Sequence, residues 1–213
     1  MSLVEAAISA FLQAAVLGGI PFLGYLTYQK WRHKRTFREI AGRAGLQVGV
    51  PRYLVYSLAF ALLGVIIIWL WSPPLEPLIR QGSAERQFVG LGLGMQAITR
   101  AFLYGGVQTG FTEELLFRGL IAGSLSRHLP VLWANVSQAF IFFLPHLLIL
   151  LMMPEMWPVL PLVFVGALVF GWIRIKSGSI VGSWLMHASG NVSMALMVAA
   201  RTSPWAAART ETR

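Results

Sequence analysis

Long apolar stretches alternate with short polar segments along this chain. Six stretches are apolar enough to be interpreted as membrane helices, since about 20 helical residues cross the hydrocarbon core of a bilayer. They cover residues 4–28, 53–71, 101–127, 132–153, 158–173 and 179–200. Prolines stand in several of the intervening turns, among them Pro73, Pro74 and Pro154, where they cannot continue a helix. The pattern predicts an all-α polytopic membrane protein.

The segment at residues 85–100 has two interpretations. Gly90, Gly92 and Gly94 alternate with apolar residues there. The segment is either a short interfacial helix or the first part of a further span, so the predicted bundle has six to seven transmembrane helices. We favour six spans and an interfacial helix.

Composition and charge support a membrane location. The chain is 56% hydrophobic and only 12% charged, which is too apolar for an ordinary soluble domain. Seven of the 17 basic residues lie in the segment from Lys30 to Arg52, against the single acid Glu39. A basic segment next to a span is the positive-inside signal and suits anionic lipid headgroups. We therefore expect this segment to be cytoplasmic, with lipid headgroups rather than nucleic acid as its partner. The chain has no cysteine, which excludes disulfides and thiolate metal ligands.

Three charges interrupt the third apolar stretch. Glu113, Glu114 and Arg118 lie near its middle, where each charge costs about 3 kcal/mol or more and needs a partner. Glu114 and Arg118 are four residues apart with the acid first, the favourable order for an ion pair on a helix. Glu113 is rotated by about 100° from Glu114, so its carboxylate is free to face another group.

Two later apolar stretches contribute histidines and an amide. His146 follows Pro145, whose ring loosens the helix locally. His187 and Asn191 are four residues apart and lie on one helical face, and Gly190 between them is expected to let another backbone approach closely. Each of these polar residues taken alone also fits a structural role in packing or interhelical hydrogen bonding.

The combination points to chemistry. Glu113, His146, His187 and Asn191 lie at comparable depths in their predicted spans, so a bundle can bring them together inside it. Carboxylates, imidazoles and an amide provide a general base with oxyanion donors, or a metal site. The sequence contains no HEXXH zinc motif and no G-x-S-x-G serine motif.

Three motifs resemble those of the CPBP family, the type II CAAX prenyl endopeptidases and their bacterial relatives in bacteriocin processing or immunity. They are E-E-x-x-x-R at residues 113–118, F-x-x-x-H at residues 142–146 and H-x-x-x-N at residues 187–191. The motifs stand in the family's order on separate predicted helices, and the resemblance covers about residues 101–200. On this basis residues 1–100 form an N-terminal membrane region, residues 101–200 a catalytic helical core and residues 201–213 a polar tail.

The resemblance implies a role for each motif residue. Glu113 and His146 would activate a water molecule, and His187 and Asn191 would stabilise the oxyanion. Glu114 and Arg118 would hold the site in shape. We expect no cofactor; if the site held a metal such as zinc, its ligands would be Glu113, His146 and His187.

The function implied by the resemblance is intramembrane proteolysis. The expected enzyme is a multi-pass protein of a bacterial inner membrane that cuts a membrane-anchored protein or peptide near its C-terminal end. The compact chain also resembles the sorting-type, myxosortase-like members. Two alternatives remain open: a non-catalytic bacteriocin immunity or scaffold protein of the same fold, and a proton-coupled transporter, since intramembrane Glu and His also build proton relays.

Overall fold

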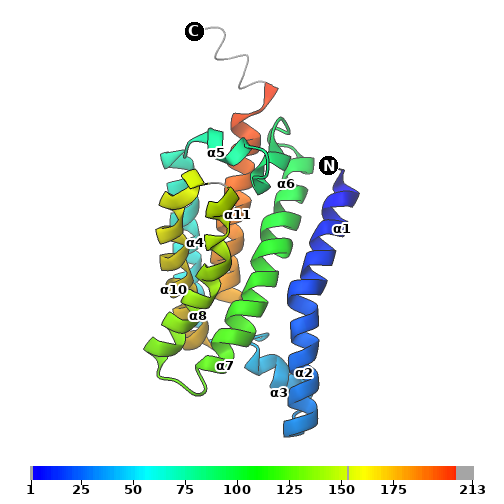
Figure 1. Cartoon of the computed structure of the whole chain (residues 1–213), viewed down its shortest axis with the longest axis vertical. Coiled ribbons are helices and arrows are strands. Elements are labelled where there is room, and N and C mark those ends of the chain that lie inside the picture. The colour runs from blue at the N-terminus through cyan, green and yellow to red at the C-terminus, as the bar shows by residue number, and fades with distance from the viewer. Residues whose placement is uncertain (1, 153, 205–213) are drawn as a thin grey trace.

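Six long helical rods stand side by side in the computed structural model, which describes residues 2–152 and 154–204 (Figure 1). The start of the first rod and the end of the last lie at the same end of the bundle. The rods alternate in direction and are joined by short turns and short helices. The all-α membrane fold predicted from the apolar pattern is confirmed.

The basic segment connects the first two rods. The first is continuous and consists of α1 (Leu3–Gln13), the π-helical η1 (Ala14–Gly19) and α2 (Ile20–His33). Ser2 and Glu5 form a capping box at its start, which satisfies backbone donors that a helix N-terminus leaves unpaired. The chain then forms the short helix α3 (Phe37–Arg43) and returns as α4 (Pro51–Trp71). α3 therefore lies at the opposite end of the bundle from the N-terminus (Figure 1).

The third rod begins earlier than the sequence predicted. It consists of α6 (Met95–Ala101), two π-helical segments, η3 (Phe102–Phe111) and η4 (Glu114–Ala122), and α7 (Gly123–Leu125). The segment between α4 and this rod contains the short helices α5 (Leu75–Ile79) and η2 (Ala84–Phe88). Gly90 and Gly92 have positive φ angles of 79° and 63°, a backbone that glycine adopts readily and that turns the chain. The segment at residues 85–100 is thus neither an additional span nor one interfacial helix, but a short 3₁₀ helix, a turn and the start of the third rod.

The last three rods complete the bundle. They are α8 (Val131–Leu147), α10 (Leu160–Ser177) and α11 (Val181–Arg201), and the short helices α9 (Ile149–Met152) and η5 (Pro154–Val159) connect the first two of them. Most of the predicted polar tail, residues 201–213, lies outside the described residues, and α11 ends at Arg201.

Fewer helices than predicted are individually long and apolar enough to cross a membrane. In the described part of the chain three qualify, at Leu3–His33, Pro51–Trp71 and Trp157–Ser177, and Val131–Leu147 is apolar but shorter. The third rod and α11 carry the polar motif residues, which lower their mean hydropathy. Large apolar side chains such as Val4, Leu62 and Leu70 are 67%, 62% and 81% exposed on the outer faces of the rods, as expected where lipid covers them. The chain is an integral membrane protein.

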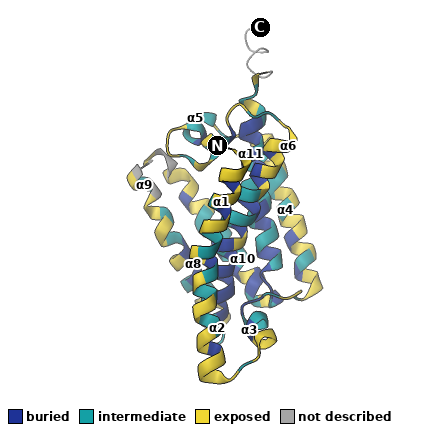
Figure 2. Cartoon of the chain, turned by 90° about the vertical axis from the view of Figure 1, so that its right-hand side faces the viewer, coloured by how far each residue is buried: buried dark blue, intermediate teal, exposed yellow. Residues whose placement is uncertain are grey.

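α11 is the central element of the packing. It contacts α4, η3, α10 and α6, and its buried face is visible between the outer rods in Figure 2. Gly105 in η3 lies close to its backbone, since a Cβ atom there would lie 2.7 Å from the backbone nitrogen of Val192. Gly190, the residue expected to admit a neighbouring backbone, has no atom within 4 Å of the corresponding position. A neighbouring backbone does approach this part of α11 closely, but the glycine that permits the approach is Gly105 in the facing helix and not Gly190.

We therefore expect Gly105→Ala to destabilise the protein by roughly 1–3 kcal/mol, because the added methyl group meets backbone atoms that cannot rotate away. Thermal unfolding in detergent measures the change. Gly64→Ala in α4 is the matched control, since a Cβ there meets nothing within 4 Å. Equal melting temperatures for the two variants would contradict this account of the packing.

Candidate active site

The acidic motif lies where the third rod is wound as a π-helix. η3 covers Phe102–Phe111 and η4 covers Glu114–Ala122, so Glu113 stands at the junction of the two segments. The Oγ1 atoms of Thr109 and Thr112 donate hydrogen bonds to carbonyl oxygens five residues earlier, at 3.1 and 3.0 Å. π-helical turns are rare and are found frequently at functional sites.

Glu114 and Arg118 form the predicted ion pair. The Nη1 atom of Arg118 lies 3.1 Å from Oε1 of Glu114, and both side chains are completely buried. The guanidinium also lies over two aromatic rings, with its carbon 4.1 Å from the ring centre of Phe142 and 5.4 Å from that of Phe170. A buried charge is costly unless it is paired, and this pair connects the third rod to α8 and α10.

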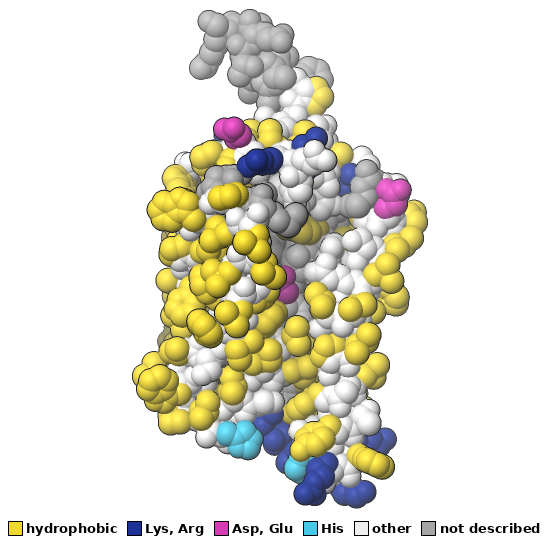
Figure 3. Space-filling model, in the orientation of Figure 1, with side chains coloured by type: hydrophobic (Ala, Val, Ile, Leu, Met, Phe, Trp, Pro, Cys, Tyr) yellow, Lys and Arg dark blue, Asp and Glu magenta, His cyan; other side chains and the backbone are white. Residues whose placement is uncertain are grey.

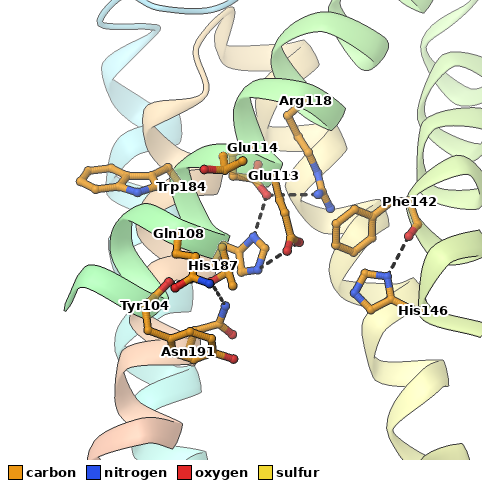
Figure 4. Close-up of polar contacts among 12 residues, drawn as sticks. Tyr104, Gln108, Glu113, Glu114, Arg118, Phe142, His146, Trp184, His187 and Asn191 are labelled. Carbon is orange, nitrogen blue, oxygen red and sulfur yellow. Dashed lines mark hydrogen bonds and ion pairs between the residues drawn. The ribbon is translucent and has the colours of Figure 1, made fainter. Parts of the chain in front are cut away.

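His187 lies between the two adjacent glutamates (Figure 4). Its Nδ1 atom is 3.0 Å from Oε1 of Glu114, and its Nε2 atom is 3.9 Å from Oε2 of Glu113. An ionised carboxylate only accepts hydrogen bonds, so Nδ1 carries the proton directed at Glu114. The distance from Nε2 to Glu113 is longer than a hydrogen bond, and these two groups remain able to engage a third molecule.

The two carboxylates therefore have different environments. The Glu114 side chain is 0% exposed, whereas that of Glu113 is 22% exposed. Glu114 is engaged by both Arg118 and His187, while the only ion pair or hydrogen bond of Glu113 within the described residues is the long contact with His187. Figure 3 shows an acidic side chain at mid-height in a hollow of the otherwise apolar face. Glu113 is thus the carboxylate of the pair that has access to a substrate or water.

Asn191 lies one helical turn beyond His187 and is held by the third rod. Its Nδ2 atom donates a 2.8 Å hydrogen bond to Oγ1 of Thr109. Trp184, one turn before His187, donates from Nε1 to the carbonyl oxygen of Gly106 at 2.8 Å. These two bonds fix the face of α11 that carries His187 against η3. One N–H of the Asn191 amide is used, and the second remains available for another acceptor.

His146 stands apart from the other motif residues. Its Nδ1 atom is 2.8 Å from the carbonyl oxygen of Phe142 in the same helix. A carbonyl only accepts, so Nδ1 carries the proton and Nε2 is left with a free lone pair. The ring of Phe142 packs on both histidines, with centroid distances of 4.6 Å to His146 and 6.3 Å to His187. No described contact joins His146 to Glu113, and Phe142 is the residue that links the two halves of the site.

The residues offered as ligands for zinc do not form a ligand set here. Among residues 2–152 and 154–204, no three His, Asp or Glu side chains lie together as ligands for one ion. Glu113, His146 and His187 are therefore not assembled around a common point in this arrangement, because His146 lies across the Phe142 ring.

Several residues that support the site were not predicted from the sequence. Thr109, Trp184 and Phe170 position Asn191, the α11 backbone and Arg118 respectively. Thr109 and Trp184 are each separated by about one turn from a motif residue, Glu113 and His187 respectively, and that spacing was the available signal. Phe170 carries no such signal, because aromatic residues are common throughout a membrane helix.

Comparison with protein families gave one match to the segment that carries all three motifs. Residues 95–193 match the family model described as type II CAAX prenyl endopeptidase Rce1-like. Curated proteins and solved structures gave no match to the chain. The matched segment begins at the first residue of the third rod, Met95, and includes the Glu113, His146 and His187 motifs. Residues 95–193, which carry all three motifs, are thus similar to the Rce1-like type II CAAX prenyl endopeptidases, a family of proteases.

Proposed function

We propose that this protein is an intramembrane endopeptidase in which Glu113 activates water for attack on a peptide bond. One observation carries the proposal: of two adjacent intramembrane carboxylates, one is buried and paired with Arg118 and His187, and the other is accessible. A paired carboxylate is a poor base because its charge is already stabilised, whereas an accessible one can accept a proton from a bound water. The match of residues 95–193 to a family of proteases supports the same assignment.

In the proposed reaction Glu113 acts first as a base and then as an acid. Glu113 takes a proton from water as the water oxygen attacks the carbonyl carbon of the scissile bond. The tetrahedral intermediate then collapses, the C–N bond breaks, and Glu113 returns the proton to the leaving nitrogen. The products are a carboxylic acid and an amine, so the enzyme ends in its starting protonation state.

The oxyanion is assigned to Asn191 and His187. The second N–H of the Asn191 amide points from a side chain that Thr109 already fixes, and preorganised donors of this kind are effective in a site with little water. His187 can donate from Nε2 only as an imidazolium, because its Nδ1 proton is directed at Glu114. The free Nε2 of His146 is proposed to orient the attacking water from the α8 side, once substrate or water spans the gap beside Phe142.

The remaining assignments concern substrate and location. We propose a membrane-anchored protein or peptide as substrate, cut near its C-terminal end, in a bacterial inner membrane. The site's position within the apolar belt supports a substrate that is itself embedded in the bilayer. Catalysis is proposed to need no metal cofactor, since Glu113 and the two histidines supply the acid–base groups.

Glu113→Gln should abolish cleavage while leaving the fold intact, because the amide keeps the shape of the side chain but cannot accept a proton. A general base contributes roughly 10²–10⁴-fold to a rate, so the residual activity should be below about 1%. Neo-termini of membrane proteins, mapped by mass spectrometry in cells that express each variant, provide the measurement. Glu76→Gln is the matched control, since that carboxylate is exposed and lies outside the site.

The result would contradict the proposal if the Glu113→Gln cells showed the same neo-termini as the wild type. Absence of wild-type-dependent neo-termini, combined with a biological effect that persists in Glu113→Gln, would favour the non-catalytic immunity or scaffold protein.

Breaking the buried pair should act on stability. Arg118→Met leaves the Glu114 charge without its cation and should cost roughly 3–5 kcal/mol, whereas Glu114→Gln combined with Arg118→Met removes both charges and should recover part of that loss. Unfolding of the purified variants by titration with a denaturing detergent measures the difference. If Arg118→Met unfolds like the wild type, the pair does not hold the bundle together.

Activity of the purified protein should persist in a chelator such as EDTA. Reconstituted enzyme and a membrane substrate identified from the neo-termini provide the assay, with zinc content measured on the same sample. Loss of activity in chelator and its recovery with added zinc would contradict the metal-free mechanism.

A further inference from the structure

A second polar site lies at the basic end of the bundle, away from Glu113. A pocket of about 610 Å³ opens there between α3, the end of the third rod and the end of α10. This volume falls within the range of small-ligand sites, about 300–1,000 Å³. Its lining comes from three segments that are distant in the sequence, at residues 35–47, 123–127 and 174–178. The pocket is therefore a product of the tertiary fold.

The lining of this pocket carries a large excess of positive charge. Five arginines line it against a single acid, Glu39; the arginines are Arg35, Arg38, Arg43, Arg127 and Arg174. The acid is already engaged, because Oε2 of Glu39 accepts hydrogen bonds from the backbone nitrogen and Oγ1 of Thr36 at 2.7 and 2.8 Å. In the described part of the chain none of these arginines forms an ion pair with a carboxylate. The pocket therefore keeps a net positive charge, with one carboxylate against five guanidinium groups.

Arg174 is the most buried of the five, at 5% exposure. Its Nη2 atom donates to the carbonyl oxygen of Arg43 at 2.9 Å, and Nη1 of Arg127 donates to the same oxygen at 3.4 Å. Two guanidinium cations thus share one neutral acceptor. The Nε atoms of Arg43, Arg127 and Arg174 have no hydrogen-bond partner among the described residues.

The backbone around Arg174 is shaped to hold this side chain. A Cβ atom at Gly45 would lie 2.7 Å from its Nε, and one at Gly123 would lie 2.9 Å from its Nη2. Gly45 also has a φ of +77°, so glycine is favoured there on conformational grounds too. The two glycines leave room for the buried Arg174 cation, which has no anionic partner among the described residues, although burying an unpaired charge is costly. An external anion removes that cost.

We propose that this arginine pocket binds the phosphate group of an anionic ligand. Guanidinium groups present planar, paired N–H donors that match phosphate oxygens. The pocket lies at the end where Lys and Arg side chains gather in Figure 3, at the boundary of the apolar belt. Headgroup phosphates of anionic lipids lie at that level of a membrane, and a free phosphate compound on the same side offers the same chemistry.

Native mass spectrometry of the full chain in a non-ionic detergent tests the proposal. The probes are short-chain phosphatidylglycerol, phosphatidylcholine and inorganic phosphate, each titrated separately. Arg38→Gln combined with Arg43→Gln should weaken binding of the anionic lipid about tenfold or more, because both lost groups line the pocket. Lys30→Gln combined with Arg32→Gln removes the same charge from the same end outside the pocket and should change binding less than about twofold.

Arg174→Lys provides an independent variant that keeps the charge but loses the planar donor set, and it should also weaken binding. Binding of inorganic phosphate with the same dependence on the variants, in the absence of lipid binding, would support the pocket and identify a free phosphate compound as its ligand. Equal losses in the pocket and control variants would overturn the proposal. So would the absence of binding of both phosphatidylglycerol and inorganic phosphate. None of these readouts depends on protease activity.

Discussion

A carboxylate buried inside a membrane bundle must be balanced by other groups, and Glu114 meets this requirement through two contacts. Arg118 lies 3.1 Å away in the same rod, and His187 approaches to 3.0 Å from α11. The Arg118 guanidinium also stacks on Phe142 and Phe170. The Glu114–Arg118 pair therefore fixes the third rod relative to α8, α10 and α11. The rods that carry the three motifs are therefore held together by the same interaction that orients the candidate site.

This arrangement explains why two glutamates stand side by side. The first consequence of the buried pair is that His187 has a fixed orientation, with Nδ1 committed to Glu114 and Nε2 directed towards Glu113. The second is that Glu113, at the junction of the two π-helical segments, makes only the longer 3.9 Å ion-pair contact, with Nε2 of His187, among the described residues. In the proposed mechanism, structural and chemical roles are thereby separated between neighbouring residues, since one carboxylate cannot be both fully neutralised and available as a base.

Buried charges are stabilised differently in the two polar regions of the molecule. At mid-depth, where lipid surrounds the bundle, Glu114 and Arg118 balance each other within the chain. At the basic end, Arg174 and Arg127 share a backbone carbonyl and have no protein anion. The difference follows from solvent access, because ions and headgroups reach the end of the bundle but not its centre.

The sequence alone determined the all-α membrane fold, the Glu114–Arg118 pair and the three motifs that resemble those of a protease family. Each of these depends on local spacing: apolar length for a span, four residues for an ion pair, and four residues for one face of a helix. Only the tertiary structure decided the partners of the motif residues. That His187 lies between both glutamates, that Asn191 is held by Thr109, and that Phe142 separates His146 from His187 all depend on how the rods pack against one another. The close approach by Gly105 instead of Gly190 has the same origin, because a pattern within one helix does not specify which face of another helix it meets.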